Sequence, residues 1–185
     1  MFMGLLAALP ITAALFGLFG GPDPDRPHLS ELQIALQDYR VEASFELVNG
    51  FTDELFERIQ AGLADGFRYD FALSRDHKTW FDNRIDATSL EVIAKYNAVT
   101  QEYLVNFRQD GKLIESRVVR ERDELERIMT RFSRVPLFSV EDVKTDRRLV
   151  VKARADLGSK TVLLLIPKTV STDWVQSRKF RIDSE

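Results

Sequence analysis

Apolar and polar residues alternate along most of the chain from residue 32 onward, and this two-residue period is typical of strands with one buried face. In the first such segment the apolar positions change phase near Asp38, which predicts a strand over 32–47 with a bend or bulge at 38–40. Further alternating segments predict strands at 67–73, 90–96, 102–109, 112–119, 137–143, 147–157 and within 161–182. The pattern therefore predicts about eight strands.

The dipeptide Asp110-Gly111 separates two of these segments and suits a tight hairpin turn, because both residue types adopt positive φ readily. Short turns also join most other neighbours, whereas parallel pairing needs a crossover of about a dozen residues. The strands are therefore expected to pair antiparallel.

Two segments have a helical period instead. The segment 52–66 begins with Thr52 as an N-cap and reaches Gly66 as a stop signal, and its apolar residues are Leu55, Phe56, Ile59 and Leu63. The segment 120–132 places four apolar residues on one helix face: Leu125, Ile128, Met129 and Phe132. We predict an α+β fold, mainly antiparallel β and sandwich-like, with two amphipathic helices covering open faces or ends.

The first 21 residues carry no ionisable side chain, and a helix of that length reaches roughly the 30 Å thickness of a bilayer core. Gly17, Gly20 and Gly21 resemble the cleavage region of a secretory signal peptide, although no basic residue precedes the apolar run. We interpret 1–21 as a cleaved signal peptide or, second, an uncleaved membrane anchor; a buried helix of a soluble fold is the third interpretation. The first two place the rest of the chain in the periplasm.

A proline-rich stretch, "GPDPDRP", follows this segment. Its prolines fix φ and prevent a helix from continuing, so residues 22–30 are expected to form an extended connector. The remaining residues, 31–185, are enough for one domain that buries about two-thirds of its unfolded surface without disulfides. We predict a single β-rich extracytoplasmic domain there.

The amino-acid composition excludes several classes of function. The formal net charge is −3 with a pI near 5.6, and cations are interleaved with carboxylates, which disfavours nucleic-acid binding. The chain has no cysteine, so thiol catalysis and cysteine-ligated metal sites are absent. Neither a Walker sequence nor a G-x-G-x-x-G loop occurs, and no cofactor or metal site is predicted.

Groups suited to catalysis are few. The two histidines are His28, in the connector, and His77, which follows Asp76 and lacks any recognisable nucleophile motif. Four carboxylates could meet in the fold as a hydrolytic pair: Asp70, Asp82, Asp86 and Glu91. Sets of this kind occur in any chain of this length, so we expect that the protein is not an enzyme, and a hydrolase ranks third among the functions considered.

Aromatic residues are the stronger candidates, because tryptophan is favoured at binding sites. Trp80 and Phe81 lie together between two predicted strands, where they either grip a partner or plug one end of the sheet layers. Trp174 has the same two interpretations. The basic tail behind it, which includes Arg178 and Lys179, either contacts anionic lipid headgroups or protects an edge strand.

The motifs "AGLADGFRYDF", "SRDHKTWFDN", "KYNAVTQEY", "RERDELERIM", "VVKARADL" and "TDWVQSRKF", in this order, resemble the bacterial family called domain of unknown function 4390. The resemblance covers nearly all of the chain after the connector, and its landmarks are Arg75, Trp80, Asp82, Tyr96, Tyr103, Arg154, Ala155, Thr172, Asp173 and Trp174. Asn97 stands where the family pattern has Asp, which weakens the idea of a catalytic carboxylate there. The resemblance implies an exported or membrane-anchored protein of Gram-negative bacteria, sometimes encoded near sensor kinases, with no established activity.

Together these observations favour a non-catalytic binding module of the bacterial envelope, whose partner is an envelope protein or a membrane-associated ligand. Residues 1–21 would add membrane contact if they stay uncleaved. The alternative is a periplasmic carrier or sensor of an apolar small molecule, held between sheet and helices.

Overall fold

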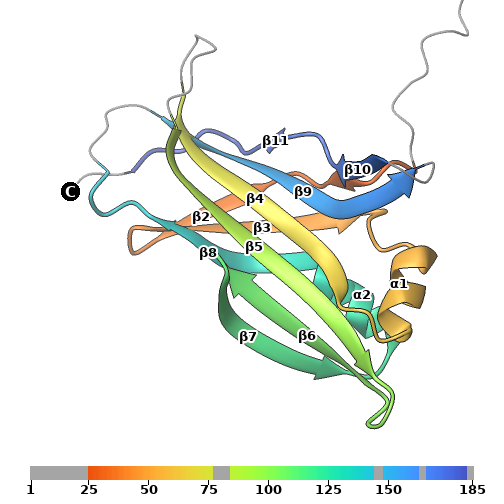
Figure 1. Ribbon diagram of the computed structural model, residues 1–185. Helices are drawn as coiled ribbons and strands as arrows, with labels where there is room; N and C mark the ends of the chain where they lie inside the picture. Colours follow the sequence, from red (N-terminus) through yellow and green to blue (C-terminus); the bar gives the residue numbers. More distant parts are fainter. Residues whose placement is uncertain (1–24, 77–83, 144–147, 163–165, 183–185) are drawn as a thin grey trace, which may run out of the picture.

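The computed structural model describes residues 25–76, 84–143, 148–162 and 166–182 (Figure 1). Two helices are described, α1 (Asp53–Gln60) and α2 (Arg122–Thr130). The described strands, eleven in number, are β1 (His28–Leu29), β2 (Gln33–Gln37), β3 (Arg40–Val48), β4 (Asp65–Arg75), β5 (Arg84–Asn97), β6 (Glu102–Gln109), β7 (Lys112–Val119), β8 (Arg131–Ser139), β9 (Leu149–Val162), β10 (Ile166–Ser171) and β11 (Val175–Gln176).

The strands form two sheets that pack face to face (Figure 1). The larger sheet has the order β10-β9-β4-β5-β6-β7, and β11 pairs with β9 beside β10. The smaller sheet is centred on β3, which pairs with β2, with β8 and, near its end, with β1. Every pairing is antiparallel, so the predicted α+β class with a mainly antiparallel, sandwich-like architecture is confirmed.

The core lies between the two sheets. An aromatic cluster joins them: the ring of Phe45 on β3 lies 5.2 Å from that of Tyr69 and 5.4 Å from that of Phe71, both on β4. Phe132 of β8 stacks on Phe45 at 4.8 Å. Because the inward residues of each strand alternate with outward polar ones, the pattern that predicted the strands also predicts this core.

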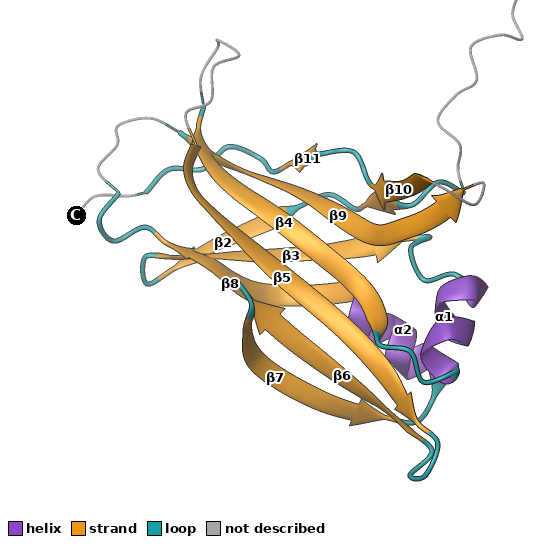
Figure 2. Ribbon diagram, in the orientation of Figure 1, coloured by secondary structure: helices purple, strands orange, loops and turns teal. Residues whose placement is uncertain are grey.

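The two helices close one end of the sandwich (Figure 2). Helix α1 buries Leu55 and Ile59, and α2 buries Leu125 and Met129. Thr52 caps α1 as predicted, since its hydroxyl accepts a hydrogen bond from the Leu55 amide at 3.2 Å.

Two boundaries differ from the sequence prediction near the first helix. The segment 32–47 is two strands, because Asp38 and Tyr39 both have positive φ and make a two-residue hairpin turn between β2 and β3. Helix α1 ends at Gln60, before Gly62 (φ 85°), and Gly66 lies in β4 instead. A Cβ on Gly66 would lie 2.0 Å from the Val92 carbonyl oxygen, so this glycine permits close pairing with β5.

The second helix also ends earlier than predicted. Helix α2 stops at Thr130 and β8 follows directly, with Arg131 already extended, so Phe132 packs from a strand and not from the helix. Pro136 lies inside β8. A proline is tolerated there because, among the described strands, β8 pairs with β3 alone and therefore has a free edge.

The hairpin predicted at Asp110-Gly111 is confirmed. Gln109 pairs with Lys112 across the turn, and both turn residues have positive φ. The Asp110 carboxylate accepts hydrogen bonds from the Ser89 amide at 2.8 Å and from the Thr88 hydroxyl at 2.9 Å, which fixes the hairpin tip against β5.

At the amino end, the structure places His28 and Leu29, within the expected connector, in β1 paired with β3. Residues 1–21, the predicted signal peptide or anchor, lie outside the described residues. Of the helices that the structure describes, neither is long and apolar enough to cross a membrane.

Candidate functional site

Of the three predicted binding residues, the structure describes Trp174. Trp80 and Phe81 lie outside the described residues. Trp174 is described: it immediately precedes β11, and its side chain is 49% exposed, unusual for so large an apolar group.

Trp174 lies in a short segment, 172–177, whose two ends are both hydrogen-bonded to β9. Thr172 exchanges two hydrogen bonds with Ala155: its amide donates to the Ala155 carbonyl and its hydroxyl accepts from the Ala155 amide, both at 2.9 Å. Ser177 does the same with Val151, at 2.9 and 3.0 Å. Thr172 and Ser177 are buried, so we call this segment the strap and regard it as a fixed support for Trp174.

The indole of Trp174 folds over the outer face of the larger sheet. The guanidinium carbon of Arg154, on β9, lies 4.9 Å from the indole ring centre, a cation–π contact. Arg154 in turn donates to the Asp70 carboxylate on β4, at 3.1 and 3.2 Å. Arg154 therefore supports the indole, and its ion pair with Asp70 fixes the position of Arg154.

Asp70 belongs to a ladder of ion pairs that crosses the sheet. Arg68 donates to Asp70 at 2.9 Å and to Glu91 on β5 at 3.0 Å. The hydrogen bond to Asp70 raises the pKa of the Arg68 guanidinium, so Arg68 keeps its charge within the ladder. Asp70 and Glu91, two carboxylates considered for hydrolysis, therefore serve as ion-pair partners here.

Of the remaining candidates for acid–base chemistry, the structure describes Asp86 and His28. The Asp86 carboxylate accepts a hydrogen bond from the following amide, that of Ala87, at 2.8 Å. His28 is exposed in β1. His77 and Asp82 lie outside the described residues.

A groove of about 460 Å³ opens beside the indole on the same face. Its floor is formed by Ala72 and Ser74 of β4, whose small side chains leave a depression between the neighbouring strands. Its walls are Arg84 of β5, Lys152 of β9 and three strap residues, Trp174, Val175 and Gln176. We call this feature the Trp174 groove.

Two cations, Arg84 and Lys152, line the groove. Lys152 lies opposite Ala72 in the β4–β9 register, and Arg84 lies opposite Ser74 in the β4–β5 register. Both side chains belong to exposed residues, and within the described part of the chain no carboxylate forms an ion pair with either. The cations in the ladder beneath Trp174 are, by contrast, already paired.

The chemistry of the groove is that of an anion-binding surface. Arg84, Lys152, the Ser74 hydroxyl and the Gln176 amide all supply hydrogen-bond donors, and the indole supplies an apolar face. No group of three or more His, Asp or Glu side chains suited to a metal ion occurs among the described residues. The arrangement suits binding, with the indole as an anchor and the cations as complementary charges.

The chain matches the family model with the description Domain of unknown function (DUF4390) over residues 25–184. The chain belongs to this family. No curated protein and no solved structure matches the chain. The DUF4390 domain therefore contains the whole two-sheet sandwich, the strap included.

Several residues on which the resemblance to this family rests lie at the strap and beneath its indole. Ala155 and Thr172 fasten the strap, and Arg154 supports the indole of Trp174. Tyr96 and Tyr103 form a separate pair near the helices, with ring centres 4.9 Å apart, and burial raises the pKa of the Tyr103 hydroxyl. The family landmarks near the carboxyl end are thus residues that hold Trp174 in its exposed position.

Sequence reasoning identified Trp174 but missed Arg84, Lys152 and the floor residues. Three strands, β6 to β8, and helix α2 separate Arg84 from Lys152 along the chain, and only strand register brings the two residues to one groove. The signal that could have indicated the strap is the pair Thr172 and Ser177, two small hydroxyl residues that flank the tryptophan.

Proposed function

We propose that this DUF4390 protein is a non-catalytic binding module of the bacterial envelope that engages a protein partner through the Trp174 groove. The observation that carries the proposal is the half-exposed indole, held on the strap beside two cations that form no ion pair with any described residue. Tryptophan and arginine are the residues most enriched among those that dominate binding energy. A rigid anchor also loses little conformational entropy on binding, which favours affinity.

Affinity isolation with the full chain tests the proposal. Trp174→Ala should remove the partner that the unmodified chain retains, because the variant loses the anchor. Its melting temperature should fall by only a few degrees, since the residue is half exposed and its cation–π contact contributes about 0.5–1 kcal/mol.

Val99→Ala is the matched control. Val99 is 92% exposed in the turn between β5 and β6, at the end of the sheet away from the strap, so its truncation should change neither binding nor stability (Figure 1). Undiminished partner recovery with Trp174→Ala would contradict the proposal. A large loss of stability in that variant would instead indicate that Trp174 is a structural residue.

The envelope location rests on a separate observation, the uncharged apolar segment at 1–21. Fractionation of the native bacterium, with the intact mass of the mature chain, tests it. A periplasmic chain whose mass begins near Gly20 or Gly21 would indicate a cleaved signal, and the full mass in the inner membrane would indicate an anchor. A cytoplasmic chain of full mass would contradict the envelope location.

A second function, carriage or sensing of an apolar small molecule, is favoured by one other feature. A cleft of about 390 Å³ lies where the sandwich is open between β7 and β8. Its apolar lining includes Leu90, Phe107, Ile114, Ile128 and Phe132. Three arginines at the cleft are each already paired with a glutamate, so it offers apolar surface without free charge.

Native mass spectrometry of the gently extracted chain tests this second function. A copurifying lipid-like mass that disappears with Phe107→Ala would support it, with Val99→Ala as the control. A bare protein mass after mild extraction would count against it.

A further inference from the structure

The charges and spacing of the Trp174 groove indicate the chemistry of its partner. Resting on the proposed function, we infer that the groove binds an extended acidic segment of a protein, with one apolar side chain on Trp174 and carboxylates on Lys152 and Arg84.

The charges that line the groove indicate the charge of its ligand. The whole chain has a formal net charge of −3, yet the described residues that line the groove contain two cations and no carboxylate. Ser74 and Gln176 are uncharged and can donate hydrogen bonds to an anion, and the indole N–H can only donate. An acidic ligand therefore finds complementary charge, and a basic ligand meets like charge.

The strand register gives the spacing. Lys152 and Arg84 lie on the two strands that flank β4, and their partners on β4, Ala72 and Ser74, are two residues apart. From strand spacing and rise, their Cα atoms lie roughly 12 Å apart. Carboxylates three or four residues apart in an extended chain span about 10–13 Å, so each meets one cation.

The third anchor lies on the same line. Trp174 stacks on Arg154, which pairs with Asp70, the next outward residue before Ala72 on β4. Along β4 the order is therefore indole, Lys152, Arg84. An apolar side chain followed by two spaced acidic residues reproduces this order.

The floor distinguishes a peptide segment from a membrane surface. A bilayer contacts side chains that project from a face, whereas Ala72 and Ser74 form a recess between taller walls. An extended chain that lies in this recess can place its carboxylates beside Lys152 and Arg84.

Indole NMR signals of the full chain in zwitterionic micelles provide the test, because the chain has two tryptophans and the Trp174 signal is identified with Trp174→Phe. The probe is the peptide Leu-Ser-Glu-Gly-Ser-Glu with blocked ends, and its control is the same peptide with both Glu replaced by Gln. The Glu peptide should shift the Trp174 signal, with an affinity that falls as salt rises from about 20 to about 200 mM. The Gln peptide should not.

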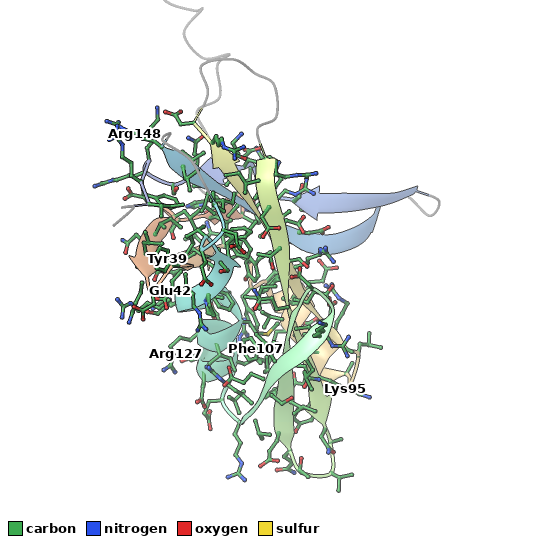
Figure 3. The ribbon with its side chains drawn as sticks, turned by 90° about the vertical axis from the view of Figure 1, so that its left-hand side faces the viewer. Tyr39, Glu42, Lys95, Phe107, Arg127 and Arg148 are labelled. Atoms are coloured by element: carbon green, nitrogen blue, oxygen red, sulfur yellow. The ribbon has the colours of Figure 1, made fainter. Side chains whose placement is uncertain are left out.

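Charge variants give the second readout. Arg84→Gln combined with Lys152→Gln should weaken binding of the Glu peptide at least about tenfold, because two charge-assisted hydrogen bonds are lost. The matched control is Lys95→Gln combined with Lys112→Gln, since both control lysines are exposed outside the groove. Figure 3 shows Lys95 toward the opposite end of the molecule from Arg148, which borders the groove end of β9.

The inference would be overturned by equal binding of both peptides, by binding undisturbed by the charge variants, or by a Trp174 shift with micelles containing anionic lipid but none with the Glu peptide. A shift produced by inorganic phosphate alone would overturn it likewise. These failures are distinguishable from failure of the proposed function, because a native partner lost with Trp174→Ala but kept with the charge variants would leave the binding module standing and remove only its acidic ligand.

Discussion

At the scale of single residues, Tyr69 shows how the core tolerates a polar group. Its side chain is fully buried in the aromatic cluster, and its hydroxyl donates to the Met129 carbonyl of α2 at 2.8 Å. This bond ties β4 of the larger sheet to the second helix, and it satisfies both groups.

Tyr69→Phe should therefore lower the free energy of unfolding by about 1–3 kcal/mol, because the Met129 carbonyl loses its donor from Tyr69. Burial raises the pKa of the Tyr69 hydroxyl well above its usual range, so only the unfolded state ionises as the pH rises past about 10. Stability from this group is complete below that pH and declines above it. Urea unfolding at pH 8 and pH 11 should show a smaller gap between the two proteins at the higher pH; a constant gap would contradict this role.

Gly66 provides a second test at this scale. An added Cβ would lie 2.0 Å from the Val92 carbonyl oxygen and 3.0 Å from the Ile93 Cα, both backbone atoms of β5. Gly66→Ala should thus destabilise the fold by about 3 kcal/mol or more.

The comparison for Gly66 is Gly158→Ala. Gly158 has φ 82° but nothing within 4 Å of an added Cβ, so we expect backbone strain of only about 1–2 kcal/mol. Denaturant midpoints of the two variants decide the matter. A smaller loss for Gly66→Ala than for Gly158→Ala would show that close pairing with β5 does not require glycine.

At the scale of elements, the strap shows how an irregular segment can be rigid. It pairs with β9 over only two residues, Val175 and Gln176, but Thr172 and Ser177 extend the attachment on either side with side-chain and backbone hydrogen bonds. The exposed tryptophan can keep one position because its support is fastened at both ends.

Thr172→Val tests the strap, because valine has nearly the same shape and lacks the hydroxyl. The buried Ala155 amide would lose its acceptor, which lowers stability by about 1–3 kcal/mol and speeds hydrogen exchange at that amide. Thr172→Ser keeps the acceptor and should behave almost like the unmodified chain. Equal exchange of Ala155 in all three proteins would show that the strap does not depend on this bond.

The elements also show what the sequence can and cannot predict. Alternation along 67–73 predicted β4 because one residue in two faces the core, and Asp110-Gly111 predicted its hairpin through backbone preference alone. The prediction of one strand with a bend at 38–40 was wrong, since a hairpin turn separates two strands there. The turn was missed because Tyr39 is not a typical residue for positive φ. Gly66 was misplaced because its role depends on the backbone of β5, which no local pattern reveals.

At the scale of the whole molecule, the candidate site arises from assembly of distant segments. Ala72, Arg84, Lys152 and Trp174 come from three strands and the strap, and their proximity depends on the order β9-β4-β5 and on its register. Composition could suggest that Trp174 binds something, but the cations beside it follow only from the fold.

The central claim is that Trp174 contacts the protein partner in the cell. Site-specific photocrosslinking in living cells tests this claim most directly. A photoreactive phenylalanine analogue would replace Trp174 in the full chain, or Val99 in the control, in the native bacterium. We predict a discrete crosslinked adduct at position 174 that is absent at position 99 and disappears when Arg84→Gln and Lys152→Gln are added. No adduct at 174, or the same adducts at both positions, would contradict the account.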